Sequence, residues 1–240
     1  MFFIGHRGTR LDFDENTIEA FKIALKSGAN IIEFDVRKLK DNSLIVFHNH
    51  SLERTTNSTG LLKNFTYAEI KKIKTKRMKR GIPLLSEVFD ALKGKCKFLI
   101  DLKDEGIFEE VIKIVLNYDL LKDCIFSGRN FNELMIIKNH LPKIQVCYNI
   151  TKGKGLSLSE FFKLANNGKL IFKPDLISLK SNLIDILFIQ ACHKNKIMAL
   201  TWDFINYSNP IEKIESIIKM GIDGILFDDY KNISLIKDEM

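Results

Sequence analysis

Short apolar runs alternate with longer segments of helical periodicity along the whole chain. Segments 15–28, 85–94, 106–118, 130–141 and 210–221 carry the apolar spacing of amphipathic helices. The runs are rich in Ile, Val, Leu and Phe, as buried parallel strands are, and lie at 2–6, 30–36, 97–103, 124–128, 144–150, 175–180, 197–203 and 223–229. Eight such strands alternating with helices predict an α/β fold of the (β/α)₈ (TIM) barrel type, which typically needs ~250 residues.

One further apolar run, at 43–48, does not fit this alternation. Only about six residues separate it from the run at 30–36, whereas neighbouring parallel strands need a crossover of about a dozen or more. The Asp41-Asn42 pair favours a tight turn, so we predict a β-hairpin excursion after the second strand. The returning strand would bring His48 over the carboxyl-terminal mouth of the barrel, where barrel enzymes hold their active sites.

The remaining chain contains no linker-like segment and no internal repeat. We therefore expect a single barrel domain over residues 1–240. Residues 49–84, between the hairpin and the next helix, are too few for a large inserted domain, and we expect a small lid there.

Charged residues lie at the ends of several predicted strands. Glu33 and Asp35 alternate on one strand, so their side chains share a face, and Asp101 and Lys103 do the same on the next. Because the strand ends of a parallel barrel meet at one opening, we expect the three carboxylates to converge. Crowded carboxylates repel one another unless a cation lies among them, and oxygen ligands favour Mg²⁺ or Ca²⁺.

Two of the five histidines fall at the same opening, His6 after the first strand and His48 after the hairpin. A pair of histidines beside a metal suits phosphodiester cleavage, because one can take a proton from the attacking hydroxyl while the other gives one to the leaving oxygen. Arg7, in a glycine-flanked turn, provides a fork for phosphate oxygens, and Lys103 provides a point charge.

The chain resembles the glycerophosphodiester phosphodiesterase family of bacteria and archaea, and the resemblance spans nearly all of it. The most specific motifs lie in the first third of the sequence, and weaker ones follow near the end. They are His6-Arg7-Gly8, Glu15-Asn16-Thr17, Glu33-Phe34-Asp35-Val36, His48-Asn49, the stretch 52–60 containing Arg54-Thr55-Thr56-Asn57, the stretch 82–92, Thr201-Trp202 and 221–225.

The resemblance implies a role for each matching residue. His6 and His48 would form the general acid–base pair, and Trp202 would line the pocket for the alcohol part of the substrate. Glycerophosphodiesters would be cleaved to glycerol 3-phosphate and an alcohol through a cyclic phosphate. The implied ligands of a divalent cation are Glu33, Asp35 and Asp101, and the implied phosphate-binding residues are Arg7 and Lys103.

Two positions depart from the family pattern, and they leave alternatives open. Asn49 stands where the family has aspartate, and Asp101 stands where it has glutamate. One alternative is therefore a catalytically weak phosphodiester-binding homologue. Another is a lysophospholipase D-like lipid phosphodiesterase, although no exposed amphipathic segment provides the apolar ramp it would need. A metal-binding nuclease motif around His48 lacks its surrounding context.

Charge and cysteine content add less than they first suggest. The net charge of +7 would fit a nucleic-acid binder, but segment 71–80 alone carries seven Lys or Arg and no acid. We therefore expect a local basic edge that attracts anionic small molecules, and no nucleic-acid partner. Four scattered cysteines indicate buried thiols, and neither a leader nor a membrane span is recognisable. We expect a cytoplasmic enzyme of glycerol and lipid metabolism, monomeric or homodimeric, without stable membrane insertion.

Overall fold

The computed structural model describes residues 1–170 and 172–238. The strands in this part of the chain form one sheet and coincide with the apolar runs of the sequence. They are β1 (Phe2–Gly5), β2 (Ile31–Lys38), β3 (Leu44–Val46), β4 (Lys97–Leu102), β5 (Cys124–Gly128), β6 (Gln145–Asn149), β7 (Leu176–Lys180), β8 (Met198–Trp202) and β9 (Gly224–Phe227).

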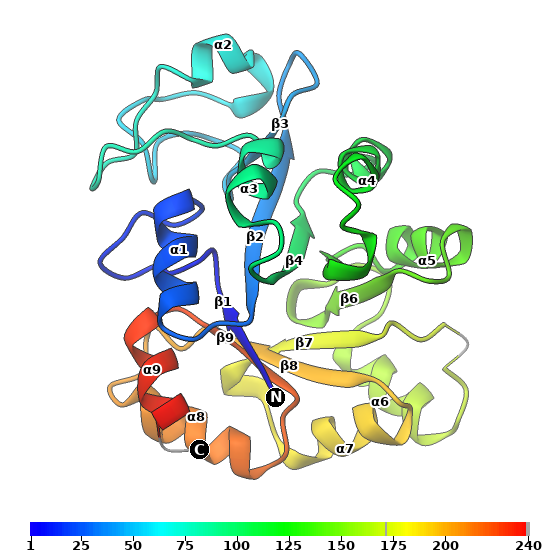
Figure 1. Cartoon of the computed structure of the whole chain (residues 1–240). Helices are drawn as coiled ribbons and strands as arrows, with labels where there is room; N and C mark the ends of the chain where they lie inside the picture. Colours follow the sequence, from blue (N-terminus) through cyan, green and yellow to red (C-terminus); the bar gives the residue numbers. More distant parts are fainter. Residues whose placement is uncertain (171, 239–240) are drawn as a thin grey trace.

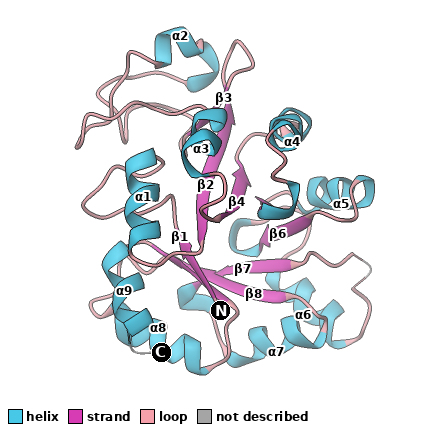
Figure 2. Cartoon of the chain, viewed as in Figure 1, coloured by secondary structure: helices cyan, strands magenta, loops and turns pink. Residues whose placement is uncertain are grey.

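The sheet closes into a barrel. β1 pairs in parallel with both β2 and β9, and each remaining strand except β3 is parallel to its neighbours. Helices surround the strands (Figures 1 and 2), which confirms the predicted barrel. They are α1 (Ile18–Lys26), α3 (Leu85–Leu92), α4 (Phe108–Asn117), α5 (Phe131–His140), α6 (Leu158–Asn166), α7 (Ile186–Lys194), α8 (Pro210–Lys219) and α9 (Tyr230–Asp238). The short helix α2 (Tyr67–Ile70) lies apart from the barrel, in the chain between β3 and α3.

Local signals in the sequence explain where α1 begins and ends. Thr17 caps its start by accepting a hydrogen bond from the backbone N–H of Ala20 at 3.2 Å. Gly28 follows its end with φ of +105°, a conformation that glycine adopts without strain. The helix buries a narrower stripe than its apolar pattern suggests, since its fully buried members are Ala20, Phe21 and Ala24.

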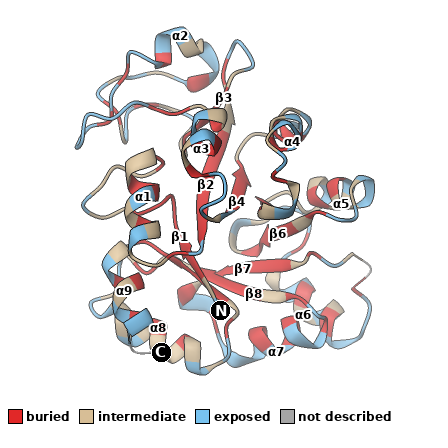
Figure 3. Cartoon of the chain, viewed as in Figure 1, coloured by how far each residue is buried: buried red, intermediate tan, exposed pale blue. Residues whose placement is uncertain are grey.

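Most of the apolar core lies between the strands and the helices, and the outer faces of the helices are exposed (Figure 3). A smaller cluster fills the barrel interior, and every barrel strand contributes one residue to it. Its members are Ile4, Ile31, Leu99, Ile125, Cys147, Leu176, Leu200 and Leu226. This ring is the floor beneath the open carboxyl-terminal end of the barrel.

β3 returns along β2 in the antiparallel direction, with Val46 opposite Val36. The turn between them contains Asn42 at φ of 63°, and the Asp41 carboxylate accepts the N–H of Ser43 at 3.1 Å. The Phe47 N–H then donates to the carbonyl oxygen of Asp35 at 2.9 Å. The returning chain therefore brings His48 alongside the end of β2.

Residues 49–84, which we call the insertion segment, pack around a small apolar cluster of their own. This cluster joins the hairpin to the segment and consists of Leu39, Ile45, Phe47, Leu52, Leu62, Ile70, Ile73 and Ile82. Asp14, on the loop after β1, holds the basic stretch by accepting from Thr75 Oγ1 at 2.7 Å and from the N–H of Met78 at 2.6 Å. The basic residues are thus attached to a loop that borders the barrel opening.

The four cysteines are free thiols. Cys124, Cys147 and Cys192 are buried, and Cys96 is half-buried. Burial raises the pKa of Cys147 to about 12, which leaves the thiol protonated and unreactive at neutral pH. No helix in the described residues is long and apolar enough to cross a membrane.

Candidate active site

A ring of polar side chains lies directly above the apolar floor of the barrel. Side chains on a strand alternate, so the residue two positions beyond each floor residue also faces the interior. Applying this spacing to the eight floor residues gives His6, Glu33, Asp101, Ser127, Asn149, Ser178, Trp202 and Asp228. Every strand changes from apolar to functional side chains at the same height, and this change marks the candidate site.

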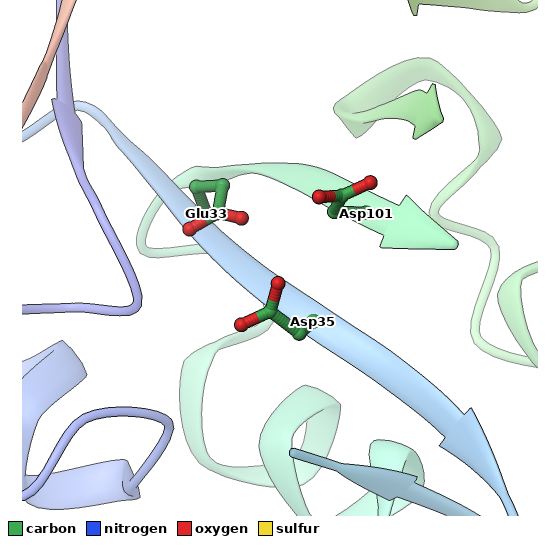
Figure 4. Close-up of side chains that lie close together, drawn as sticks. All are labelled: Glu33, Asp35 and Asp101. Atoms are coloured by element: carbon green, nitrogen blue, oxygen red, sulfur yellow. The ribbon is translucent and has the colours of Figure 1, made fainter. Parts of the chain in front are cut away.

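Glu33 and Asp35 on β2 and Asp101 on β4 form a compact carboxylate cluster. One oxygen of each lies within 4.8 Å of the others, and their side chains point into the same space (Figure 4). The register places Asp35 beside Asp101, so the two strands bring the acids together as expected. All three are buried.

Burial and neighbouring charges shift the pKa values of the two acids of β2 in opposite directions. Burial, reinforced by the charge of Asp35, raises the pKa of Glu33 well above its usual range. Against the effect of burial, Lys103 and Arg7 hold the pKa of Asp35 well below its usual range. Asp101 Oδ1 is buried and has no hydrogen-bond donor among the described residues. Oxygens arranged in this way suit a hard divalent cation.

Both predicted phosphate-binding cations contact this cluster. Lys103 Nζ lies 2.8 Å from Asp35 Oδ1 and also forms an ion pair with Asp101. Arg7 has φ of 53°, its N–H donates to Glu33 Oε2 at 2.7 Å, and its Nε lies 3.1 Å from Asp35 Oδ2. The glycine-flanked turn therefore directs both the backbone and the guanidinium of Arg7 at the acids.

His6 is held by a carboxylate that our sequence reasoning missed. Its Nδ1 lies 2.7 Å from Asp228 Oδ1, which belongs to the residue that follows β9. Burial lowers the pKa of His6, although Asp228 opposes this effect. Burial acts to raise the pKa of Asp228, but His6 and Arg10 hold it well below its usual range. Because an ionised carboxylate only accepts, the His6 proton lies on Nδ1 and Nε2 is left free.

His48 has a neutral partner instead. Its Nδ1 lies 2.7 Å from Asn49 Oδ1, which also accepts from Arg54 Nε at 2.9 Å. Because Arg54 Nε can only donate, this amide atom is the oxygen, and His48 therefore donates to it from Nδ1. Burial lowers the pKa of His48 to about 4, with Arg7 and Lys103 acting in the same direction and Asp35 opposing them.

The Glu15-Asn16-Thr17 motif supports the site from the loop after β1. The Glu15 carboxylate accepts from Arg7 Nη1 at 2.9 Å and also pairs with Arg54. Asn16 Nδ2 donates to Asp35 Oδ2 at 2.7 Å. Thr17 is the cap of α1 described above, so one short motif orients a cation, a metal-ligand candidate and a helix.

Trp202 closes the ring beside His6. The two ring centroids are 6.3 Å apart with an edge-on orientation, and the buried indole N–H has no acceptor among the described residues. The structure thus brings together every site residue predicted from the sequence. It adds Asp228, which could have been noticed because the run at 223–229 ends in two aspartates at a strand end.

The sequence of this chain is similar to those of known proteins. The model of the glycerophosphoryl diester phosphodiesterase family matches residues 6–232. A glycerophosphodiester phosphodiesterase from Caldanaerobacter subterraneus is 32% identical over 241 residues, covering 94% of this chain and 93% of the relative.

Solved structures show the same barrel. A glycerophosphodiester phosphodiesterase from Agrobacterium tumefaciens superposes with a TM-score of 0.82 at 20% identity, covering 99% of each chain. A phosphodiesterase from Oleispira antarctica, solved with the product sn-glycerol 3-phosphate, gives a TM-score of 0.81 at 21% identity, covering 100% of this chain and 97% of the other.

Proposed function

Because the chain belongs to the glycerophosphoryl diester phosphodiesterase family of phosphoric diester hydrolases, we propose that it hydrolyses glycerophosphodiesters to glycerol 3-phosphate and an alcohol. One observation carries this proposal: a buried carboxylate cluster at the barrel mouth is flanked by His6 and His48, each with Nδ1 engaged. The Nε2 atoms of both imidazoles are therefore available for proton transfer at the barrel mouth.

The proposed metal ligands fit a divalent cation. Glu33, Asp35 and Asp101 offer only oxygen atoms, they are buried, and Asp101 Oδ1 has no other partner in the described chain. When bound, Mg²⁺ or Ca²⁺ would stabilise the negative charge that develops on the phosphate and on the attacking hydroxyl. Asp101 is one methylene shorter than the family's glutamate, yet it lies within the cluster.

We assign His6 as the general base. Its contact with Asp228 fixes the tautomer and stabilises the imidazolium that forms when Nε2 takes the proton of the glycerol 2-hydroxyl. The hydroxyl oxygen then attacks phosphorus. Trp202 lies against His6, so we assign its ring to the glycerol side of the site. Arg7 and Lys103 would hold the phosphate oxygens.

We assign His48 as the general acid. Asn49 accepts its Nδ1–H but contributes no negative charge, so protonated His48 gives up its Nε2 proton readily. That proton passes to the oxygen of the departing alcohol, and a cyclic phosphate remains. In the second half of the reaction the roles reverse, and His48 activates the water that opens the ring.

The test is release of glycerol 3-phosphate from glycerophosphocholine, measured with and without Mg²⁺ or Ca²⁺. We expect turnover that EDTA abolishes. His140→Ala removes an exposed histidine on α5 and serves as the matched control for changes at His6 and His48. Absence of turnover under every metal condition would refute the proposed function.

A second candidate, lysophospholipase D activity, would require an apolar surface for the acyl chain of its substrate. A pocket of about 440 Å³ lies beside the site. It shares the ion pair of Arg37 and Asp104 with the smaller pocket that His48 lines. Its apolar lining consists of Leu39, Leu61, Leu62 and Ile107. This pocket adjoins His48 and not Trp202, against which the proposed mechanism places the glycerol that carries the acyl chain, so it gives the candidate no support. Choline release from lysophosphatidylcholine at less than about a hundredth of the glycerophosphocholine rate would exclude this candidate.

A further inference from the structure

Arg129 lies at the mouth of the barrel but has no role in the chemistry described above. It follows β5 two positions after the inward-facing Ser127, so the alternation directs it to the interior at the level of Lys103. It lines a pocket of about 190 Å³ together with His48 and Asp101. The residue therefore borders the reaction site on its His48 side.

Arg129 differs from the other arginines around the mouth. Those arginines each form an ion pair with a carboxylate and are Arg7, Arg10, Arg37 and Arg54. Among the described residues Arg129 has no such partner, and its buried Nε has no hydrogen-bond acceptor. A buried donor without an acceptor is costly, so a partner supplied by a ligand would relieve that cost.

Apart from Asp101, which is a proposed metal ligand, the acids that share the pocket already have donors. Glu133 accepts the N–H of Gly106 at 2.9 Å, and Glu105 lies 3.3 Å from Lys154. Asp104 pairs with Arg37. The group in this pocket that remains available to an anionic ligand is therefore the guanidinium of Arg129.

The backbone around Arg129 is held firmly. Its carbonyl oxygen accepts the N–H of Lys154 at 2.6 Å, and the carbonyl oxygen of Lys154 accepts the N–H of Phe131 at 3.0 Å. Lys154 is 76% exposed at the side chain and adds positive charge at the rim of the pocket. A cation on a fixed backbone segment is prepared to receive an anion.

The position of the pocket indicates which part of the substrate it receives. His48 lines the pocket and His6 does not. In the proposed mechanism His48 protonates the departing alcohol, so the head group lies here; this step rests on the proposed function. A volume of about 190 Å³ suits a small head group.

We propose that Arg129 binds a carboxylate on the departing alcohol, and that the preferred substrates are glycerophosphodiesters with a small, carboxylate-bearing head group of the serine type. The planar guanidinium can donate two parallel hydrogen bonds to a carboxylate. Ethanolamine is serine without its carboxylate, so the two head groups form a matched pair.

The test compares kcat/KM for glycerophosphoserine and glycerophosphoethanolamine in the wild type, in Arg129→Gln and in Lys152→Gln. Lys152→Gln removes an exposed charge from the neighbouring loop and controls for general attraction of anions. We expect Arg129→Gln to lower the value for the serine substrate about tenfold or more and the ethanolamine value less than twofold. Lys152→Gln should lower neither value more than twofold.

An equal loss for both substrates would overturn the proposal, because Arg129 would then act on the scissile phosphate or on the fold. An unchanged serine value would also overturn it. If the wild type turned over neither substrate, the result would instead contradict the proposed function. In that case, calorimetric binding of the two diesters to His6→Ala and to His6→Ala with Arg129→Gln decides the matter. Selective loss of glycerophosphoserine binding supports the proposal, and equal affinities in the two proteins overturn it.

Discussion

Asn49 is the hydrogen-bond partner of His48, the proposed general acid, and its replacement by aspartate is the sharpest test of the site. The side chain is half-buried, and its Oδ1 accepts from His48 Nδ1 at 2.7 Å and from Arg54 Nε at 2.9 Å. Asn49→Asp keeps this oxygen and the shape of the side chain. It replaces the amide nitrogen by a second oxygen and places a full negative charge beside His48.

The size of the effect follows from the change in this hydrogen bond. A hydrogen bond to a charged group contributes about 1.5–3 kcal/mol, compared with about 0.5–1.5 kcal/mol for a neutral one. The difference of about 1.4 kcal/mol corresponds to a rise of about one in the pKa of His48, whose present value is about 4. At pH 7 the protonated fraction of His48 would then rise about tenfold.

The assay is the pH dependence of kcat/KM for glycerophosphocholine. We expect Asn49→Asp to increase kcat/KM at pH 7 by up to about tenfold, because only protonated His48 can give a proton to the leaving oxygen. The limb of the profile that reports His48 should move to higher pH. Asn64→Asp adds the same charge at an exposed position of the insertion segment and should leave the profile unchanged. If Asn49→Asp leaves kcat/KM and its pH limb where they were, the reasoning about His48 is wrong.

Four further predictions concern the rest of the site. His6→Ala and His48→Ala should each lower kcat by about 10²–10⁴-fold in protein shown to be folded at the assay temperature, and a loss under tenfold would contradict the assigned role. Ca²⁺ or Mg²⁺ should raise the thermal midpoint of the wild type but not that of Glu33→Gln. At a cation concentration of a hundred times the Kd, binding stabilises the folded protein by about 2.7 kcal/mol. Equal midpoint shifts in both proteins would place the cation elsewhere. Asp228→Asn should lower the urea-unfolding free energy by about 3–5 kcal/mol, because it breaks the largely buried ion pair of Asp228 with Arg10. The pKa of Asp228 in the folded protein is depressed, so the difference in unfolding free energy between wild type and variant should be constant above pH ~4 and should become smaller as the pH falls further. A difference that grows on acidification would contradict the pair. Neutralising the exposed lysines of segment 71–80 should lower kcat/KM at low salt only, and the same loss at ~0.5 M salt would exclude electrostatic attraction.

The sequence predicted the barrel well because its signals are local and repeated. Each strand is a short apolar run, and alternation along it assigns side chains to the interior or to the helices. The hairpin could be predicted by counting alone, since the six residues between the runs at 30–36 and 43–48 cannot make a parallel crossover. The same count predicts that the returning strand brings His48 close to Asp35.

The contacts that could not be predicted join distant residues without a pattern in either segment. His6 and Asp228 are separated by 222 positions, and neither residue type announces its partner. The role of Asn16 in holding Asp35 was equally hidden, because the sequence shows only a motif and not which oxygen it contacts. Arg129 is recognisable only by comparison with the paired arginines around it, which requires the ion pairs themselves.

The contact between His6 and Asp228 links catalysis to closure of the barrel. β1 and β9 are the first and last strands, and the barrel is complete only when they pair. Asp228 accepts from Arg10 Nη1 and from the N–H of Phe204, each at 2.7 Å, so it joins three segments as well as orienting His6. The contact that sets the tautomer of His6, the proposed general base, therefore depends on the pairing of β1 with β9. Asp228→Asn should consequently lower kcat more than it raises KM at temperatures where the variant is fully folded, because a properly closed barrel would still hold a misoriented base. A variant that kept the wild-type kcat under those conditions would show that Asp228 serves closure alone.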